Sequence, residues 1–363
     1  MLEQIRPYLL DPREDYPDPY YMLEFNGVPF STLGGIQAIS GQKKNGKSFV
    51  LTMLMAAILG NDNERTRAYL PNLRVPERTI DYLGHAPRVL YIDTEMERLN
   101  SAKVLRRVHW LCDWDMKEPN ERFNVLWLKT LKQDESDEKI YRKRYRLIKY
   151  AIEVLHPDIV FIDGLRDLLA SINDEESGTN ILSELATMAE ERHMCIWNAL
   201  HQNPTRSNDA EEAKMRGWIG TELGNKVSDT FVSVKNKSQN GVTFTVKQQD
   251  ARGKDVDDFK FIVTDDCGQL GIPKIIGTQT QEEPKGDDPA DILHWINEAE
   301  SRYEWPMSRT SIKQMVFGDI GGQKNKTKQD IDLTIAINKK WLVESTLKSK
   351  GYYMLQPADD LPF

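Results

Sequence analysis

The stretch GQKKNGKSF, residues 41–49, constrains the fold of this chain more than any other feature. It fits the pattern G-x-x-x-x-G-K-[ST], in which backbone N–H groups of a glycine-rich turn surround a diphosphate. In this pattern the lysine reaches the terminal phosphates, and the hydroxyl takes a magnesium position. The predicted nucleotide-binding residues are Gly41, Asn45, Gly46, Lys47, Ser48 and Phe49, with Ser48 also a metal ligand. We therefore expect ATP and Mg²⁺ as cofactors.

The flanking residues support this interpretation. The apolar residues Ile36, Ala38 and Ile39 predict a short strand, and residues 48–59 predict a buried helix that ends at Gly60. Strand, loop and helix is the order that a phosphate-binding loop requires. The alternative is a surface turn that happens to contain glycine and lysine.

Four further apolar runs indicate a parallel sheet. Strands that are apolar on both faces are typical of parallel sheets covered by helices. After residues 203–225, which are polar and rich in glycine, the pattern alternates as in hairpin strands, with an Asn-Gly turn signal at 240–241. The sequence thus predicts an α/β fold whose mostly parallel sheet has an antiparallel flank. The runs are 88–95, 124–128, 158–163 and 194–202, and the alternating segments are 230–235, 241–249 and 259–264.

Two segments between these runs are polar. Residues 61–87 contain two internal prolines and predict an irregular surface insertion. Residues 137–157 predict a helix with an apolar face, and its Lys and Arg residues occupy the other face. That basic face is either solvated or in contact with DNA or another subunit. The apolar face consists of Tyr141, Tyr145, Ile148, Ile152 and Leu155.

Domain boundaries follow from composition. Residues 1–276 form the predicted ATPase domain, and 277–288 have the composition of a linker. Residues 289–356 contain three helical segments and two short strand-like pieces, the plan of a winged-helix domain, although other small helical domains fit as well. Residues 357–363 form an acidic tail.

The overall composition is that of a soluble protein. No apolar run approaches the roughly 18 residues needed to cross a bilayer, and the N-terminus lacks signal-peptide features, so we expect a cytoplasmic protein with no membrane partner. Three distant cysteines indicate neither a zinc site nor a disulfide framework. The 48 Lys and Arg and 56 Asp and Glu give a net charge of -8, so any DNA contact must be local. The cysteines are Cys112, Cys195 and Cys267.

Two carboxylates follow buried strands. Asp163 ends the run 158–163 and is the predicted second magnesium ligand, with a helix N-cap as the alternative. Glu95, after the run that begins at residue 88, is the predicted base that positions the attacking water, on the expectation that its strand neighbours the phosphate loop. Asp93 is its rival.

The order of these motifs resembles the RecA-like ATPases. In that class a glutamate at the end of the strand between the phosphate loop and the aspartate strand activates water. In the ABC and AAA+ classes the glutamate usually follows the aspartate directly, whereas here Asp163 is followed by Gly164. The resemblance therefore implies a RecA-like core.

The stretches DGLRDLLASINDEES and WNALHQNPT are similar to the RepA-type hexameric replicative helicases of plasmids and mobile elements, which are relatives of DnaB. This resemblance implies a hexamer that binds single-stranded DNA, and a histidine that senses the terminal phosphate. His201 takes that position, and Gln202 is the alternative residue that would contact the nucleotide. If His201 has no sensing role, it is a histidine that forms hydrogen bonds at the end of a strand. The resemblance also implies a cation supplied by the neighbouring subunit, for which Lys247 and Arg252 are available. Alternatively, Arg252 is a solvent-exposed charged residue of a hairpin.

DNA contact in this family is made by the loops after the aspartate strand and the sensor strand. The first loop here, 171–178, is acidic and a poor phosphate binder, whereas the second contains Arg206, Lys214 and Arg216 beside acidic residues. The preferred function is an ATP-driven hexameric DNA helicase or translocase for replication or mobilisation of a plasmid, phage or mobile element. A recombinase-like DNA-repair ATPase and an ATP-switched DNA-binding regulator remain alternatives.

The tail PADDLPF, residues 357–363, resembles the terminal peptide of bacterial single-stranded-DNA-binding proteins. The resemblance implies docking of Phe363 into a pocket of host replication proteins, and a frayed polar terminus is the alternative.

Overall fold

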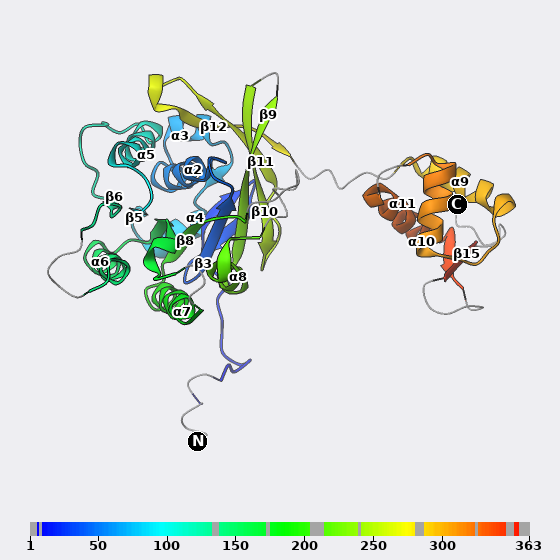
Figure 1. The fold of residues 1–363 in the computed structure, drawn as a ribbon, viewed down its shortest axis with the longest axis horizontal. Coiled ribbons are helices and arrows are strands. Elements are labelled where there is room, and N and C mark those ends of the chain that lie inside the picture. Colours follow the sequence, from blue (N-terminus) through cyan, green and yellow to red (C-terminus); the bar gives the residue numbers. More distant parts are fainter. Residues whose placement is uncertain are drawn as a thin grey trace. The chain divides into compact units, whose positions relative to one another are not determined.

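The computed structural model describes residues 6, 9–132, 138–171, 175–203, 214–238, 241–279, 287–323, 326–345 and 352–355. The chain divides into two compact units, Met1–Thr280 and Gln281–Phe363 (Figure 1). Several residues named above lie outside the described ranges. They are Arg206 of the second loop, Asn240 of the predicted turn, residues 172–174 of the first loop, and the tail with Phe363.

A nine-stranded sheet forms the centre of the larger unit, in the order β12-β11-β10-β9-β3-β8-β7-β5-β6 (Figure 1). From β9 to β6 all neighbouring strands are parallel, and from β9 to β12 all are antiparallel. This confirms the expected α/β core, a mostly parallel sheet with an antiparallel flank. The strands are β3 (Ile36–Gly41), β5 (Val89–Asp93), β6 (Phe123–Trp127), β7 (Ile159–Asp163), β8 (Cys195–His201), β9 (Asp229–Ser238), β10 (Gly241–Ala251), β11 (Asp258–Thr264) and β12 (Ile272–Gln279).

The antiparallel flank is longer than the sequence indicated. The fourth strand of the flank, β12, was not expected. It pairs with β11 as far as Gln279, so residues 277–279 belong to the sheet and not to the linker. Their polar composition fits an edge strand, which needs no apolar residues on its outer side.

Helices cover both faces of the sheet. One apolar cluster joins α2 and α5 to one face, and a second joins α6, α7 and α8 to the other. Because α2 is buried almost all round, its sequence is uniformly apolar. The helices are α2 (Lys47–Leu59), α5 (Arg98–Leu111), α6 (Ile140–Leu155), α7 (Glu175–Glu191) and α8 (Gly217–Lys226), with 3₁₀ turns at Leu165–Leu168 and Gly268–Leu270.

The prediction of an irregular insertion at 61–87 is wrong. The segment folds into α3 (Glu64–Tyr69), β4 (Leu73–Arg74) and α4 (Glu77–Leu83), and β4 completes a small sheet with β1 (Tyr21–Phe25) and β2 (Val28–Thr32). The side chain of Asn63 accepts a hydrogen bond from the backbone of Thr66 and so caps α3. Leu70, Leu73 and Val75 are buried in the main core, which anchors the segment despite its prolines.

The smaller unit has its own apolar core. Its elements follow the order helix, strand, helix, helix, strand, strand, and the three strands pair as β13-β15-β14. They are α9 (Pro289–Arg302), β13 (Met307–Ser308), α10 (Arg309–Ser311) continued by a π-helical segment (Ile312–Ile320), α11 (Lys326–Asn338), β14 (Leu342–Glu344) and β15 (Tyr352–Leu355).

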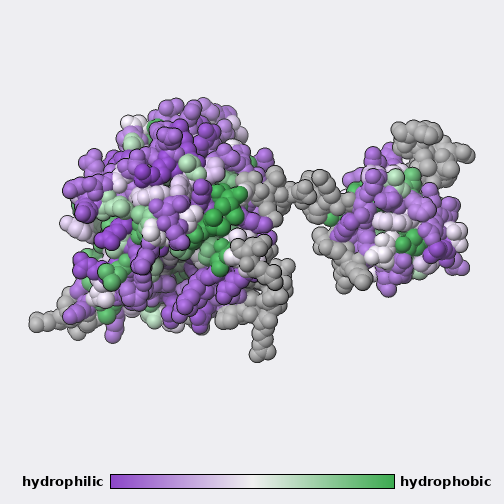
Figure 2. Space-filling model, turned by 90° about the horizontal axis from the view of Figure 1, so that it is seen from above, coloured by the Kyte–Doolittle hydropathy of each residue, from purple (hydrophilic) through white to green (hydrophobic). Residues whose placement is uncertain are grey.

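Polar residues cover most of the face of the larger unit seen in Figure 2. Within the described part of the chain, no helix has both the length and the apolar character that crossing a membrane requires.

Candidate nucleotide-hydrolysis site

The phosphate loop joins β3 to α2, and at two of its positions there is room only for glycine. Gly46 has φ +89°, and a Cβ there would lie 2.7 Å from the ring of Phe244. A Cβ on Gly41 would lie 2.9 Å from the carbonyl oxygen of Ser233. Strands β9 and β10 therefore press directly against the loop, and the backbone N–H groups at the start of α2 remain turned towards a bound anion.

The lysine of the loop is buried and held in place. Its Nζ donates to the carbonyl oxygen of Gly41 at 3.1 Å and lies 3.0 Å from Nδ1 of His201. His201 ends β8, the strand next to β3, and is paired in register with Gly41. The other ring nitrogen, Nε2, lies 3.4 Å from Oε2 of Glu95. A chain of contacts thus joins Lys47, His201 and Glu95.

A second group forms around Asp163. The hydroxyl groups of Ser48 and Tyr91 each donate to Oδ2 of Asp163 at 3.0 Å. The two predicted magnesium ligands therefore meet at hydrogen-bonding distance, and both offer the oxygen atoms that Mg²⁺ prefers. The described residues contain no cluster of three or more His, Cys, Asp or Glu that could hold a metal without phosphate oxygens.

Glu95 and Asp93 are separated by their surroundings. Oδ1 of Asp93 accepts from the backbone N–H groups of Glu95 and Met96, each at 2.9 Å, and Oδ2 accepts from the hydroxyl of Ser101. Asp93 is fully buried and fixes the turn after β5. Glu95 is about one-third exposed and faces His201. Of the two carboxylates, Glu95 is therefore the one that can reach a water molecule.

The expectation that Glu95 follows a strand next to the phosphate loop is wrong. Strands β8 and β7 lie between β3 and β5. Glu95 still reaches the site, because parallel strands all end at the same edge and the turn after β5 leads back over β7. The backbone N–H of Thr94 donates to the carbonyl oxygen of Asp163, and its hydroxyl donates to that of Gly164.

Gly164 is a requirement of this turn. It has φ +110°, and a Cβ there would lie 2.0 Å from the hydroxyl of Thr94 and 2.9 Å from Cγ of Glu95. A glutamate directly after Asp163 would collide with Glu95 and its turn. The site thus has room for one glutamate, and β5 supplies it.

Burial and neighbouring charges shift the pKa values of the ionisable groups of the site in different directions. A hydrogen bond from His201, helped by the charges of Lys47 and Arg166, lowers the pKa of Glu95, which is therefore ionised at neutral pH. Burial, together with the charges of Glu95 and Asp93, raises the pKa of Asp163 to about 6. Burial also lowers the pKa of Lys47, against the opposing effect of Asp163 and Glu95.

Phe49 and Gln202 lie at the margins of the site. The half-buried ring of Phe49 packs between Phe244, at 6.2 Å, and the guanidinium of Arg107, at 4.4 Å. Gln202 is buried, and its backbone N–H donates to the carbonyl oxygen of Gly41. Both residues therefore contact the phosphate loop or its neighbours and help to hold it in place.

The structure does not bring Lys247 and Arg252 into this site. Arg252 follows β10 and its backbone donates to Ser228, at the edge of the sheet where β3 begins. Along the chain of β9, Ser228 is about 17 Å from Ser233, the residue that touches the loop, at 3.4 Å per residue. Lys247 lies on the face covered by α8, with its Nζ 3.7 Å from Asp258.

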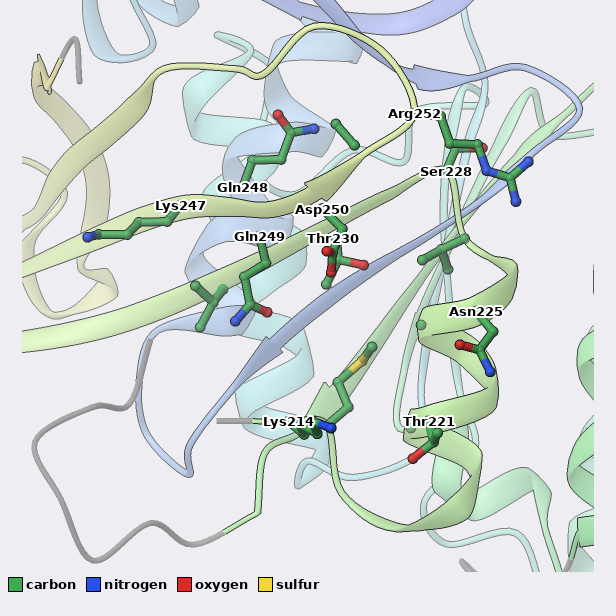
Figure 3. Close-up of a pocket in the computed structure, with 16 residues that line it drawn as sticks. Lys214, Thr221, Asn225, Ser228, Thr230, Lys247, Gln248, Gln249, Asp250 and Arg252 are labelled. Atoms are coloured by element: carbon green, nitrogen blue, oxygen red, sulfur yellow. The ribbon is translucent and has the colours of Figure 1, made fainter. Parts of the chain in front are cut away.

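Both cations line a polar pocket of about 800 Å³ between α8 and strands β9 and β10. In Figure 3 they lie at opposite ends of the pocket, with Gln249 and Asp250 between them, and Lys214 approaches from the end of the second loop. The hydroxyl of Thr230 lies in this lining and has no hydrogen-bond partner among the described residues.

Residues 29–204 match the family model described as an AAA domain. This range contains the phosphate loop, Glu95, Asp163 and His201, and it ends before Lys247. Residues 29–204 are therefore similar to a P-loop ATPase domain. Among solved structures, this chain is similar to a KaiC-like protein from the hyperthermophilic archaeon Pyrococcus horikoshii OT3, with a TM-score of 0.43 and 12% identity over 69% of this chain and 92% of that chain. The search of curated proteins gives no match.

Two residues at or beside the site escaped sequence reasoning. Tyr91 lies two residues before Asp93 on the same face of β5, but its contact with Asp163 depends on the register between β5 and β7. Lys235 lies over the ring of Phe244 beside the loop, and its position depends on the register between β9 and β10. The sequence offered only the alternation of side chains along each strand, which shows the face on which a residue lies. This alternation does not give the register between neighbouring strands.

Proposed function

We propose that this chain is an ATP-hydrolysing, ring-forming DNA translocase or helicase. The observation that carries the ATPase part is the meeting of Lys47, Ser48, Asp163 and Glu95 at one edge of the sheet. Positioning and charge stabilisation account for most of phosphoryl-transfer catalysis, and these four residues supply both.

Each residue has a distinct role in this proposal. Lys47 and the N–H groups of the loop bind the β- and γ-phosphates, and Ser48 and Asp163 would hold Mg²⁺, which neutralises phosphate charge when bound. Ionised Glu95 orients the attacking water and accepts its proton.

His201 links nucleotide binding to the release of Glu95. Because Nδ1 faces the Lys47 ammonium, it accepts a hydrogen bond, and Nε2–H therefore points to Glu95. A terminal phosphate that draws Lys47 away would leave His201 free to donate to that phosphate. Glu95 would then exchange its imidazole partner for water.

The positions of Lys247 and Arg252 favour a shared site. Arg252 lies at the edge of the sheet opposite the phosphate loop of its own copy, whereas Lys247, level with Ser40 across β9, lines the pocket on the face covered by α8. In a ring, this pocket would face the nucleotide of the next subunit, and the cations would stabilise charge on the transferred phosphate.

The DNA-directed part of the proposal is supported by the resemblance of the four motifs and by the local positive charge after β8. Lys214 and Arg216 are exposed and immediately precede α8. The first predicted loop contributes less, because α7 begins at Glu175 within it and has two acidic residues in its first turn. We place the single strand along the second loop.

The order of elements in the smaller unit favours a winged-helix-like recruiting domain. Two lysines of this unit are engaged within it, since Lys328 on α11 pairs with Asp287 and Lys313 on the π-helical segment pairs with Asp330. A helix with these pairs offers few free charges to a phosphate backbone. We therefore propose that this unit recruits a partner. For the whole chain, the second candidate function is that of an ATP-switched DNA-binding regulator.

The test is the ATPase rate with and without single-stranded DNA, together with unwinding of a forked duplex and particle images in ATP. DNA-stimulated hydrolysis, unwinding and closed six-membered rings are expected. Filaments without unwinding would favour the recombinase-like alternative, and dimers without DNA-stimulated turnover would favour the regulator.

A further inference from the structure

The turn that carries Arg252 is hydrogen-bonded to the sheet at both ends. It covers residues 252–257, between β10 and β11. At its start, the backbone N–H of Arg252 donates to the carbonyl oxygen of Ser228 at 3.1 Å. Near its end, the backbone N–H of Val256 donates to Oε1 of Gln248 at 2.6 Å. The residues between these two contacts are exposed, so the conformation of the turn depends on how its ends are held.

The side chain of Gln248 is itself anchored by a buried carboxylate. Its Nε2 donates to Oδ1 of Asp229 at 2.9 Å. The other oxygen, Oδ2, accepts from the backbone N–H of Ser31 on β2, also at 2.9 Å. Asp229 is only 6% exposed and Ser31 is fully buried. A chain of hydrogen bonds therefore runs from the core of the larger unit, through Gln248, to the turn.

The position between Asp229 and Val256 requires a group that both donates and accepts. An ionised carboxylate only accepts hydrogen bonds, and a backbone N–H only donates them. The amide of Gln248 satisfies both partners at once. A glutamate of the same size would place a second carboxylate against Asp229, and two like charges at this distance repel.

Gln248 also lies where β10 changes its register. The pairing of β10 with β9 shifts between Gln248 and Asp250, and an irregularity of this kind bends the strand and redirects the residues that follow it. Arg252 comes two residues after Asp250. The amide contacts of Gln248 therefore hold the strand at the point that sets the direction of Arg252.

We propose that Gln248 is a positioning residue, which holds Arg252 in the orientation that reaches the nucleotide of a neighbouring copy. Asp229 is the anchor of Gln248 in this role. The inference rests on the proposed shared site. Because the cation would act on the transferred phosphate, its displacement should lower kcat and leave the affinity for nucleotide unchanged.

Gln248→Glu is the variant that breaks this arrangement with the smallest change of shape. It replaces the donor that faces Asp229 with a charged oxygen and keeps an acceptor for the turn. It should lower kcat about 10-fold, with MgATP affinity within about 2-fold of the wild type. The effect should be smaller than that of losing Arg252, because the turn keeps the contact at its start and a hydrogen bond from Asn26 to Asp257.

A second substitution should restore the contact. Adding Asp229→Asn to Gln248→Glu exchanges the amide and the carboxylate between β9 and β10. The new amide can donate to the carboxylate on β10 and still accept from Ser31, so kcat should return to within about 3-fold of the wild type. The matched control is Gln269→Glu, the same substitution at an exposed glutamine between β11 and β12, which should leave kcat unchanged.

The experiment measures ATPase rates at saturating ATP, calorimetric titration with a non-hydrolysable MgATP analogue, and thermal unfolding without nucleotide for each full-length variant. Mixing then tests the role across copies. Gln248→Glu mixed with Lys47→Ala should gain activity, because the intact turn of one variant meets the intact loop of the other. Gln248→Glu mixed with Arg252→Ala should gain none, because both variants lack a working cation.

Wild-type kcat in a folded Gln248→Glu variant would overturn the proposal. A loss of activity that neither Asp229→Asn nor mixing with Lys47→Ala restores would also overturn it, since general damage to the fold would then explain the loss. Normal hydrolysis by Arg252→Ala would instead contradict the shared site on which this role depends.

Discussion

The parallel strands β3, β5, β7 and β8 bring their polar residues to one edge of the central sheet, whereas the antiparallel strands β9 and β10 carry cations to both edges. In the parallel half all strands run in the same direction, so residues that follow different strands meet at one place. In the flank, Lys235 lies beside the loop of its own copy and Arg252 lies at the opposite edge. The parallel half can therefore assemble a hydrolytic site within one copy, while part of the flank is positioned for another copy.

The largest expected effect is in the parallel half. Glu95→Gln should lower kcat about 1000-fold while nucleotide affinity stays near that of the wild type, because the amide cannot accept the proton of water. Single-turnover phosphate release and calorimetric titration measure the two properties. The matched control is Glu97→Gln, an exposed glutamate paired with Lys129, which should retain nearly full activity. Normal turnover by Glu95→Gln would refute its assignment as the base.

Lys47→Ala should weaken MgATP binding by at least about 100-fold, because a buried charge-assisted contact with phosphate is lost. Equilibrium titration with a fluorescent ATP analogue measures this loss. Lys43→Ala, an exposed lysine of the same loop, provides the control and should bind nearly as well as the wild type. Similar affinities for the two variants would contradict the assigned role of Lys47.

Asp163 should destabilise the nucleotide-free protein at neutral pH. Its pKa is about 6 in the folded protein, above the value of 3.8 for a solvated aspartate, so the folded state loses stability as pH rises from 4 to 6 and the carboxyl ionises. At pH 8, Asp163→Asn should be more stable by up to about 3 kcal/mol, and at pH 5 by about half as much. Urea unfolding without Mg²⁺ or nucleotide measures the difference.

The control for this measurement is Asp167→Asn, which makes the same substitution at a half-buried aspartate on the turn after β7. A stability gain of Asp163→Asn that shrinks between pH 5 and pH 8 would have the wrong sign and would contradict the burial of an unfavourable charge.

The parallel half was largely predictable because each of its strands is a short apolar run followed by a polar residue. The phosphate-loop motif therefore indicates Lys47 and Ser48, and the carboxylates after the strands indicate Asp163 and Glu95. His201 follows only from the family resemblance. The order of the strands in the sheet was not predictable in this way. Along the chain β5 is the next of these four strands after β3, but in the sheet it is the one furthest from β3. The contact of Tyr91 with Asp163 was missed for the same reason.

The flank was less predictable because an antiparallel register determines which edge a residue reaches. The pairing of β9 with β10 shifts between Gln248 and Asp250, and this irregularity sets the position of Arg252. Alternation of apolar and polar residues reveals neither the shift nor the proximity of Lys235 to the loop. In residues 61–87, proline content concealed a folded segment that buried leucines anchor.

In the proposed ring, the parallel half of one copy and the flank of the next complete each hydrolytic site. Arg252→Ala should bind ATP normally as a single subunit but hydrolyse it about 100-fold more slowly in the assembly, and Lys254→Ala, an exposed neighbour, should not. The direct measurement is the ATPase rate of Arg252→Ala mixed with inactive Lys47→Ala. Activity should recover in the mixture, because intact Arg252 of one variant meets the intact loop of the other. No recovery at any mixing ratio would contradict the shared site.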